Sequence, residues 1–90
     1  MSDSTEQQLE RYFTLLYFAF LQEASGKFKE QRRWTENLTT RQLFEQVIRE
    51  LSLSVSQDNF RVSINHEFVD WDQIIAVDDI VAFIPPVAGG

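Results

Sequence analysis

Cysteine is absent from this 90-residue chain, and histidine occurs once, as His66. The lack of cysteine excludes disulfides, a thiolate nucleophile, persulfide chemistry and cysteine-ligated zinc. A metal cluster based on histidine, or a Ser–His relay, would have only this one residue to use. The composition therefore argues against a metal site built on cysteine or histidine and against a Ser–His catalytic relay.

Basic residues are also scarce, with 8 Lys and Arg against 14 Asp and Glu and a formal net charge of −6. Nucleic acids and anionic membranes both require a positively charged surface, so this charge argues against either as a partner. It suits a partner with a basic face, or it simply keeps the chain soluble. The longest apolar run, at 13–21, is too short to span a bilayer, and the polar start MSDSTEQQLE lacks the basic region of a signal peptide. We therefore expect a cytoplasmic protein.

Glycine and proline are rare, with 3 Gly and 2 Pro, yet both prolines and two of the glycines fall in the final stretch IPPVAGG, 84–90. Proline has no N–H to donate to a strand ladder, and two in a row favour an extended polyproline conformation. We therefore expect residues 85–90 to form a tail that projects from the end of a strand. Six extended residues reach about 20 Å.

The side chains of this tail are small enough to enter a narrow channel. Val87 and Ala88 would thread it, and Gly89 and Gly90 have no Cβ, so a partner can close tightly around their backbone. Such a tail suits adenylation of its terminal carboxylate by ATP, followed by capture by sulfur or an amine. Since the chain has no Gly-rich phosphate loop and no nucleophile–base pair, we expect partners to supply that chemistry and no cofactor to bind this chain.

The first half of the chain predicts two strands and a helix. The apolar run 12–21 is typical of a central strand that is buried on both faces, and a turn at 23–26 follows it. The basic segment 27–34 indicates an edge strand. Apolar residues at a period of 3.6 over 43–51, with a Thr-x-x-Gln capping box at 39–42, predict the main helix.

The second half predicts three strands. Alternation over 60–64 indicates a strand with one buried face, and Asn65-His66 favours a tight hairpin into 67–69. A turn at Asp78-Asp79 then precedes a last strand at 80–84. One helix crossing a mixed sheet with apolar first and last strands inside predicts an α+β fold, the ubiquitin-like β-grasp. The domain would span 12–84, after an N-terminal extension at 1–11.

Three features together resemble one family: LLYFAFLQEASG at 15–26, the single capped helix, and VAFIPPVAGG at 81–90. They are similar to the small subunit of molybdopterin synthase, the MoaD-type sulfur carrier of the MoaD/ThiS ubiquitin-like family. The resemblance covers about 12–90 and is most specific in the last ten positions. A bare terminal Gly-Gly is shared with thiamine-type and tRNA-thiolation carriers and with ubiquitin-like protein modifiers, which remain alternatives.

The resemblance implies a non-catalytic subunit whose Gly90 is adenylated by a MoeB-type, ubiquitin-activating-like adenylyltransferase that uses ATP. The glycine then becomes a thiocarboxylate, enters a MoaE-type large subunit in a heterotetramer, and donates sulfur to cyclic pyranopterin monophosphate. Gly89 would be its permissive neighbour and 85–88 the threading segment, comprising Pro85, Pro86, Val87 and Ala88. Phe18, Phe83 and Ile84 match apolar positions at or near the partner surface.

Some residues depart from the family pattern or have a simpler interpretation. The family commonly has Asp-Gly-Asp before the last strand, where this chain has Val77-Asp78-Asp79. Gln22 stands where a basic residue is frequent, and Ile84 where an aromatic is frequent. For Phe18, Phe20 and Phe83 the competing interpretation is ordinary core packing.

Overall fold

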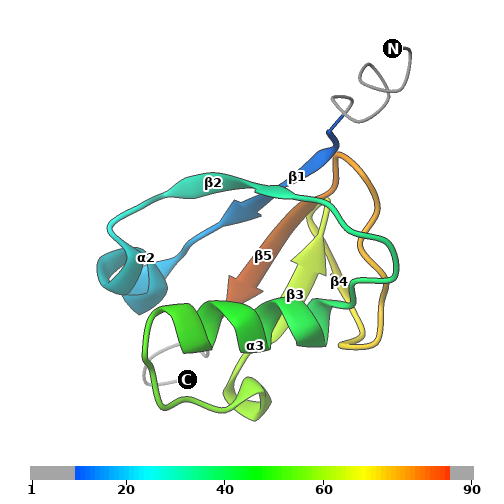
Figure 1. The fold of residues 1–90 in the computed structure, drawn as a ribbon. Coiled ribbons are helices and arrows are strands. Elements are labelled where there is room, and N and C mark those ends of the chain that lie inside the picture. Colours follow the sequence, from blue (N-terminus) through cyan, green and yellow to red (C-terminus); the bar gives the residue numbers. More distant parts are fainter. Residues whose placement is uncertain (1–9, 86–90) are drawn as a thin grey trace, which may run out of the picture.

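The computed structural model describes residues 10–85. A five-stranded mixed sheet in the order β2-β1-β5-β3-β4 is crossed on one face by helix α3 (Figure 1). β1 and β5 are parallel neighbours inside the sheet, and the other pairs are antiparallel. This is the predicted β-grasp arrangement. The strands are β1 (Tyr12–Leu16), β2 (Lys29–Arg33), β3 (Arg61–Ile64), β4 (Glu67–Val69) and β5 (Ile80–Ile84), and the helices are α2 (Ala19–Ser25), α3 (Thr40–Glu50) and the 3-10 turn η1 (Gln57–Asn59).

The core lies between α3 and the sheet. Leu43, Phe44 and Val47 form the buried face of α3, as their spacing predicts. The predicted capping box begins the helix: the Thr39 hydroxyl accepts the backbone N–H of Gln42 at 3.2 Å, and the Gln42 side chain accepts the N–H of Thr39 at 3.0 Å. Within residues 10–85, no helix has the length and apolar character needed to cross a bilayer. The sheet contributes the buried side chains of Phe13, Leu15, Val62, Ile64, Val81 and Phe83.

The prediction of one long strand over 12–21 is wrong, because β1 ends at Leu16 and a short helix, α2, follows. An apolar run without polar relief does not distinguish a strand from a short helix. Ala, Leu, Gln and Glu favour the helix over 19–25, and Gly26 ends it in the left-handed conformation at φ 73°. Only Leu21 of α2 is buried, and the nearby Phe18 and Phe20 are exposed at the surface, whereas Tyr17 is in the core.

The predicted turns at Asn65-His66 and Asp78-Asp79 are confirmed, and both rely on left-handed residues other than glycine, whereas the turn predicted at 23–26 is wrong because 23–25 belong to α2. Asn65 and His66, at φ 53° and 73°, form the tight hairpin between β3 and β4. Asp78 takes φ 71° in the turn before β5. Its neighbour Asp79 holds the same turn by accepting the backbone N–H of Ala76 at 2.7 Å and the Asn65 amide at 3.0 Å.

Substitution of these neighbouring aspartates by glycine is expected to change the free energy of unfolding in opposite directions. Asp78→Gly removes the steric penalty of positive φ and is expected to raise the free energy of unfolding by about 0.5 kcal/mol, after the entropy that glycine adds to the unfolded chain. Asp79→Gly removes two hydrogen bonds and is expected to lower it by about 1–2 kcal/mol. Urea unfolding of both variants measures the difference. Equal effects of the same sign would contradict this account of the turn.

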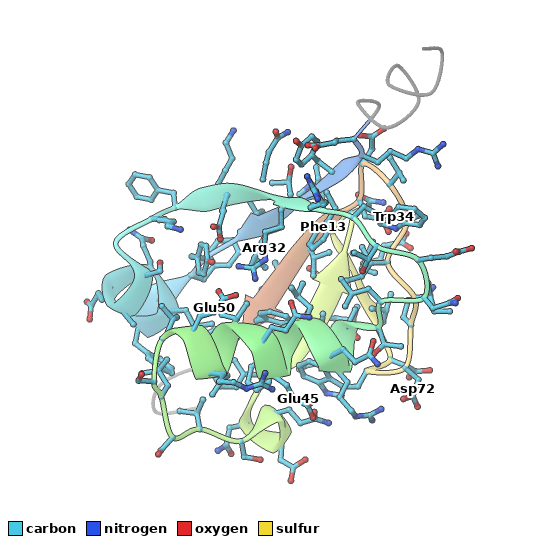
Figure 2. All side chains as sticks on the ribbon, in the orientation of Figure 1. Phe13, Arg32, Trp34, Glu45, Glu50 and Asp72 are labelled. Carbon is cyan, nitrogen blue, oxygen red and sulfur yellow. The ribbon has the colours of Figure 1, made fainter. Side chains whose placement is uncertain are left out.

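A charged network joins the edge strand β2 to the C-terminal end of α3 (Figure 2). Arg32 donates to both Glu50 oxygens at 3.0 and 2.6 Å and to Glu30 at 3.2 Å. Glu30 also accepts from Tyr17 at 2.5 Å and Lys27 at 2.9 Å. Burial favours the neutral acid, but the hydrogen bonds from Tyr17 and Lys27 and the charge of Arg32 outweigh it, so the pKa of Glu30 lies below its ordinary value. Burial, and then the bond to Glu30, raises the pKa of Tyr17 to about 12.

The lowered pKa of Glu30 predicts a loss of stability in acid. A carboxyl group whose pKa is lower when folded stabilises the fold above its unfolded pKa, and this contribution disappears as the pH falls through the folded value. Glu30→Gln is expected to be about 1 kcal/mol less stable than wild type at pH 7. The difference should shrink below the ordinary glutamate pKa of about 4.3. Glu45→Gln, on the exposed side of α3, is the matched control in thermal unfolding from pH 7 to 3 and should change little; a difference for Glu30→Gln that persists at pH 3 would contradict the assignment.

Candidate functional site

The C-terminal tail leaves the fold at Ile84 and Pro85, which we call the tail root. Phe83, the residue before it in β5, is 1% exposed. Its ring packs edge-on against Phe44 and stacks on Trp71, with ring centres 5.1 and 5.9 Å apart. Because Phe83 is held in the core, the fold determines the point from which the tail starts.

Most of the predicted tail lies outside the described residues. Pro85 is described and half-buried at the end of β5. The predicted threading and reacting residues beyond it, namely Pro86, Val87, Ala88, Gly89 and Gly90, are not among residues 10–85, and neither is most of the N-terminal extension. Their roles therefore remain predictions.

The three apolar residues assigned to the partner surface have different locations. Ile84 is half-buried, and Phe18 is 42% exposed at the N-cap of α2. For Phe18 and for Phe20, which is 38% exposed, core packing is the wrong interpretation. Phe83 is the reverse case: core packing is correct, and its side chain offers no surface to a partner. The alternation of β5 explains this, since Phe83 and Ile84 point to opposite faces of the sheet.

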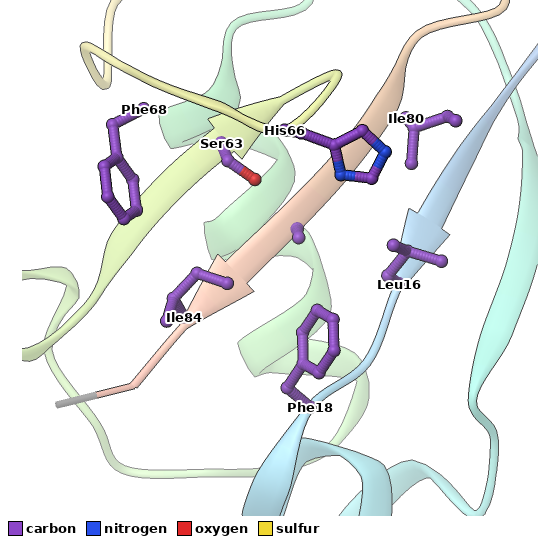
Figure 3. A pocket seen from close by; sticks show the side chains of 8 residues that line it. Leu16, Phe18, Ser63, His66, Phe68, Ile80 and Ile84 are labelled. Carbon is purple, nitrogen blue, oxygen red and sulfur yellow. The ribbon is translucent and has the colours of Figure 1, made fainter. Parts of the chain in front are cut away.

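The face of the sheet opposite α3, which we call the open face, carries an apolar hollow of about 260 Å³. Figure 3 looks onto this face, with α3 behind the strands. Phe18 and Ile84 both line the hollow, beside the tail root. The other lining residues are Leu16, Ser63, His66, Phe68, Ile80 and Ala82.

Sequence reasoning missed Leu16, Phe68 and Ile80 as members of this face. Phe68 is 54% exposed and pairs with Ser63, which in turn pairs with Ala82. Strand alternation carried part of the signal, because Ile80 and Ile84 must share a face of β5. The cross-strand register that brings Leu16 and Phe68 beside them was not predictable from that alternation.

The apolar lining of the hollow suits contact with another protein. Ser63 and His66 are the polar residues among its lining. Among residues 10–85, no group of three His, Cys, Asp or Glu side chains could hold a metal ion. An exposed apolar patch beside the start of the tail is what a docking surface requires, since burial of apolar area drives most protein association.

Comparison with known proteins identifies the family. The sequence matches the ThiS family over residues 15–90, which includes the tail and nearly the whole sheet. The chain belongs to the ThiS family. ThiS- and MoaD-type proteins are ubiquitin-like sulfur carriers, so this membership and the β-grasp sheet agree.

Solved structures show the same fold at low sequence identity. A Pyrococcus furiosus protein assigned as molybdopterin converting factor subunit 1 has a TM-score of 0.71 and 23% identity, over 86% of this chain and 99% of that one. SAMP1 from Haloferax volcanii has a TM-score of 0.70 and 20% identity, over 88% and 99%. The Haloferax volcanii HVO 2177 protein has a TM-score of 0.72 and 24% identity, over 90% and 88%. These likenesses establish the β-grasp fold for this ThiS-family chain.

Proposed function

We propose that this ThiS-family chain is the sulfur-carrier subunit of a molybdopterin synthase, with Gly90 as the residue that carries the sulfur. The observation that carries the proposal is the stretch FIPPVAGG, 83–90, which starts from a buried phenylalanine at the end of β5. The likeness in fold to the Pyrococcus furiosus converting-factor subunit supports it.

The proposed reaction takes place at the terminal carboxylate. A carboxylate oxygen of Gly90 attacks the α-phosphorus of ATP and displaces pyrophosphate, and a sulfide equivalent then displaces AMP to leave a thiocarboxylate. The tail next enters the large subunit, where its sulfur bonds to an oxygen-bearing side-chain carbon of cyclic pyranopterin monophosphate, the C–O bond at that carbon breaks, and the oxygen leaves as water. Hydrolysis of the resulting thioester leaves the sulfur on the pterin and restores the carboxylate.

The partners in this proposal are a MoeB-type adenylyltransferase, which uses the ATP, and a MoaE-type large subunit in a heterotetramer. Residues 85–88 would thread the channel of each partner, and Gly89 would allow close approach beside the reacting carbon. Phe18 and Ile84, on the open face at the tail root, would contact the partner around the mouth of that channel.

Intact mass spectrometry tests the carrier proposal. The chain is incubated with ATP, its cognate adenylyltransferase and a sulfur donor, and the expected product has gained the mass difference between sulfur and oxygen. Presenting this product to the large subunit and cyclic pyranopterin monophosphate should then yield molybdopterin. An unchanged mass with an active adenylyltransferase would refute the carrier role, and a mass gain without molybdopterin would favour a thiamine or tRNA-thiolation carrier.

A protein-modifier role is the second candidate, favoured by the likeness to the small archaeal modifier protein 1 of Haloferax volcanii. The same activated glycine would then form an isopeptide bond with a lysine amine. Conjugates of higher mass that disappear when Gly90 is removed would support this role. Their absence from cells that make the activated carrier would exclude it.

A further inference from the structure

The open face has a charge opposite in sign to that of the chain as a whole. Strand positions that face away from α3 alternate with core positions, and directly paired residues on neighbouring strands share a face. None of these outward positions on the five strands is Asp or Glu, whereas Lys29, Arg33 and Arg61 are basic. The chain as a whole has a net charge of −6.

Arg61 is a cation held in place beside the tail root. It is paired with Ile84, and its guanidinium carbon lies 3.6 Å from the centre of the Phe68 ring. Asp58 and Pro85 line a hollow with it, yet no carboxylate among residues 10–85 forms an ion pair with it. Stacking on the ring orders the guanidinium and leaves its N–H donors available to another molecule.

Lys29 is the corresponding cation on the other side of the apolar hollow. It is exposed on the edge strand β2, directly opposite Leu16, which lines the hollow. No carboxylate of the described part of the chain pairs with it, whereas Lys27 is bound to Glu30 and Arg33 to Glu10. Lys29 and Arg61 therefore flank the apolar surface as cations not neutralised by residues 10–85.

We infer that Arg61 and Lys29 select the adenylating partner, whose docking surface would carry an apolar centre flanked by carboxylates. The inference rests on the proposed function for the identity of the partner, and on the open face for its chemistry. A carrier has to be captured and released again, and charges around an apolar centre supply rate and specificity for such transient docking. Acidic residues on the partner would be left without a partner by chains whose open face lacks these cations, and such chains would bind less tightly.

Charge reversal tests the inference with a matched control. Arg61→Glu, Lys29→Glu and Arg49→Glu each change the net charge equally, but Arg49 is exposed on α3, on the other side of the sheet. Calorimetry with the cognate adenylyltransferase is expected to give a dissociation constant about tenfold higher for Arg61→Glu and for Lys29→Glu, and within about twofold of wild type for Arg49→Glu. Added salt should weaken wild-type binding more than binding of a variant that carries both Arg61→Glu and Lys29→Glu.

Adenylation is followed separately on the same proteins by ATP–pyrophosphate exchange. The inference would be overturned by equal dissociation constants for the three variants, or by no binding of wild type to the adenylyltransferase. It would also be overturned if the charge reversals weakened binding to the large subunit but not to the adenylyltransferase. If wild type supports ATP–pyrophosphate exchange and the variants bind the adenylyltransferase as tightly as wild type, the inference is refuted and the proposed function stays intact. Selective loss of binding without any exchange by wild type would support the docking surface and refute the proposed function.

Discussion

Deleting Gly90 is expected to reduce thiocarboxylate formation at least about 100-fold, because the shortened tail places its new carboxylate about 3.3 Å from the position that the activating site requires. The deletion still ends the chain in a glycine, Gly89, so it changes the reach of the tail and keeps its terminal chemistry. The rate of mass gain with saturating adenylyltransferase, ATP and sulfur donor measures the effect.

Deletion of Ser2, at the other end of the chain, is the matched control and should leave the rate unchanged. Both deletions lie outside the sheet, which spans Tyr12 to Ile84, so the two proteins should unfold at the wild-type temperature. A Gly90 deletion that is thiocarboxylated at the wild-type rate would show that the tail length is not read by the partner.

Replacing Phe44 by alanine is expected to lower the free energy of unfolding by about 3–5 kcal/mol. Phe44 is 3% exposed, and its ring centre lies 5.1 Å from Phe60, 5.3 Å from Trp71 and 5.1 Å from Phe83. Removing this ring leaves a cavity and deprives three aromatic side chains of their common contact. Domains of this size have a total stability of about 5–15 kcal/mol, so the variant should be largely unfolded in moderate urea.

Phe28 provides the matched control, since the same substitution there removes a ring that is 72% exposed. Phe28→Ala should change the free energy of unfolding by less than about 0.5 kcal/mol. Urea unfolding at 25 °C measures both. Similar losses for the two variants would contradict the aromatic core, whereas the expected difference would also explain why Phe83 can hold the tail root, since Phe44 is its packing partner.

Much of the fold was predictable because its signals are local. The helix has an apolar face of period 3.6 and a Thr39–Gln42 capping box, and both depend only on residues within a few positions of each other. The hairpin follows from Asn65-His66, which tolerate positive φ. The placement of β1 and β5 inside the sheet follows from their apolar character.

The wrong predictions concern positions whose structure depends on strand pairing or on the local backbone conformation. The run 12–21 has the apolar character of a buried strand, yet β1 pairs with β5 only as far as Leu16, and the chain then turns into α2. Phe83 and Ile84 were assigned to one surface, although the pleat of β5 sends them to opposite faces. Phe68 was not singled out, because its place beside the tail root depends on a register with β3.

The sequence by itself determined the family, the single crossing helix and the chemistry to expect of the tail. The absence of cysteine is a property of the composition, and the terminal FIPPVAGG is a property of residue order, so neither depends on the fold. Only the tertiary structure decided that Phe18, Ile84 and Phe68 share one apolar face. It also placed Lys29 and Arg61 on that same face, on opposite sides of the apolar hollow, in a chain whose net charge is negative. The physical reason is that exposure and charge complementarity depend on which distant strands become neighbours, and hydrogen-bond register sets this through contacts between residues far apart in the chain.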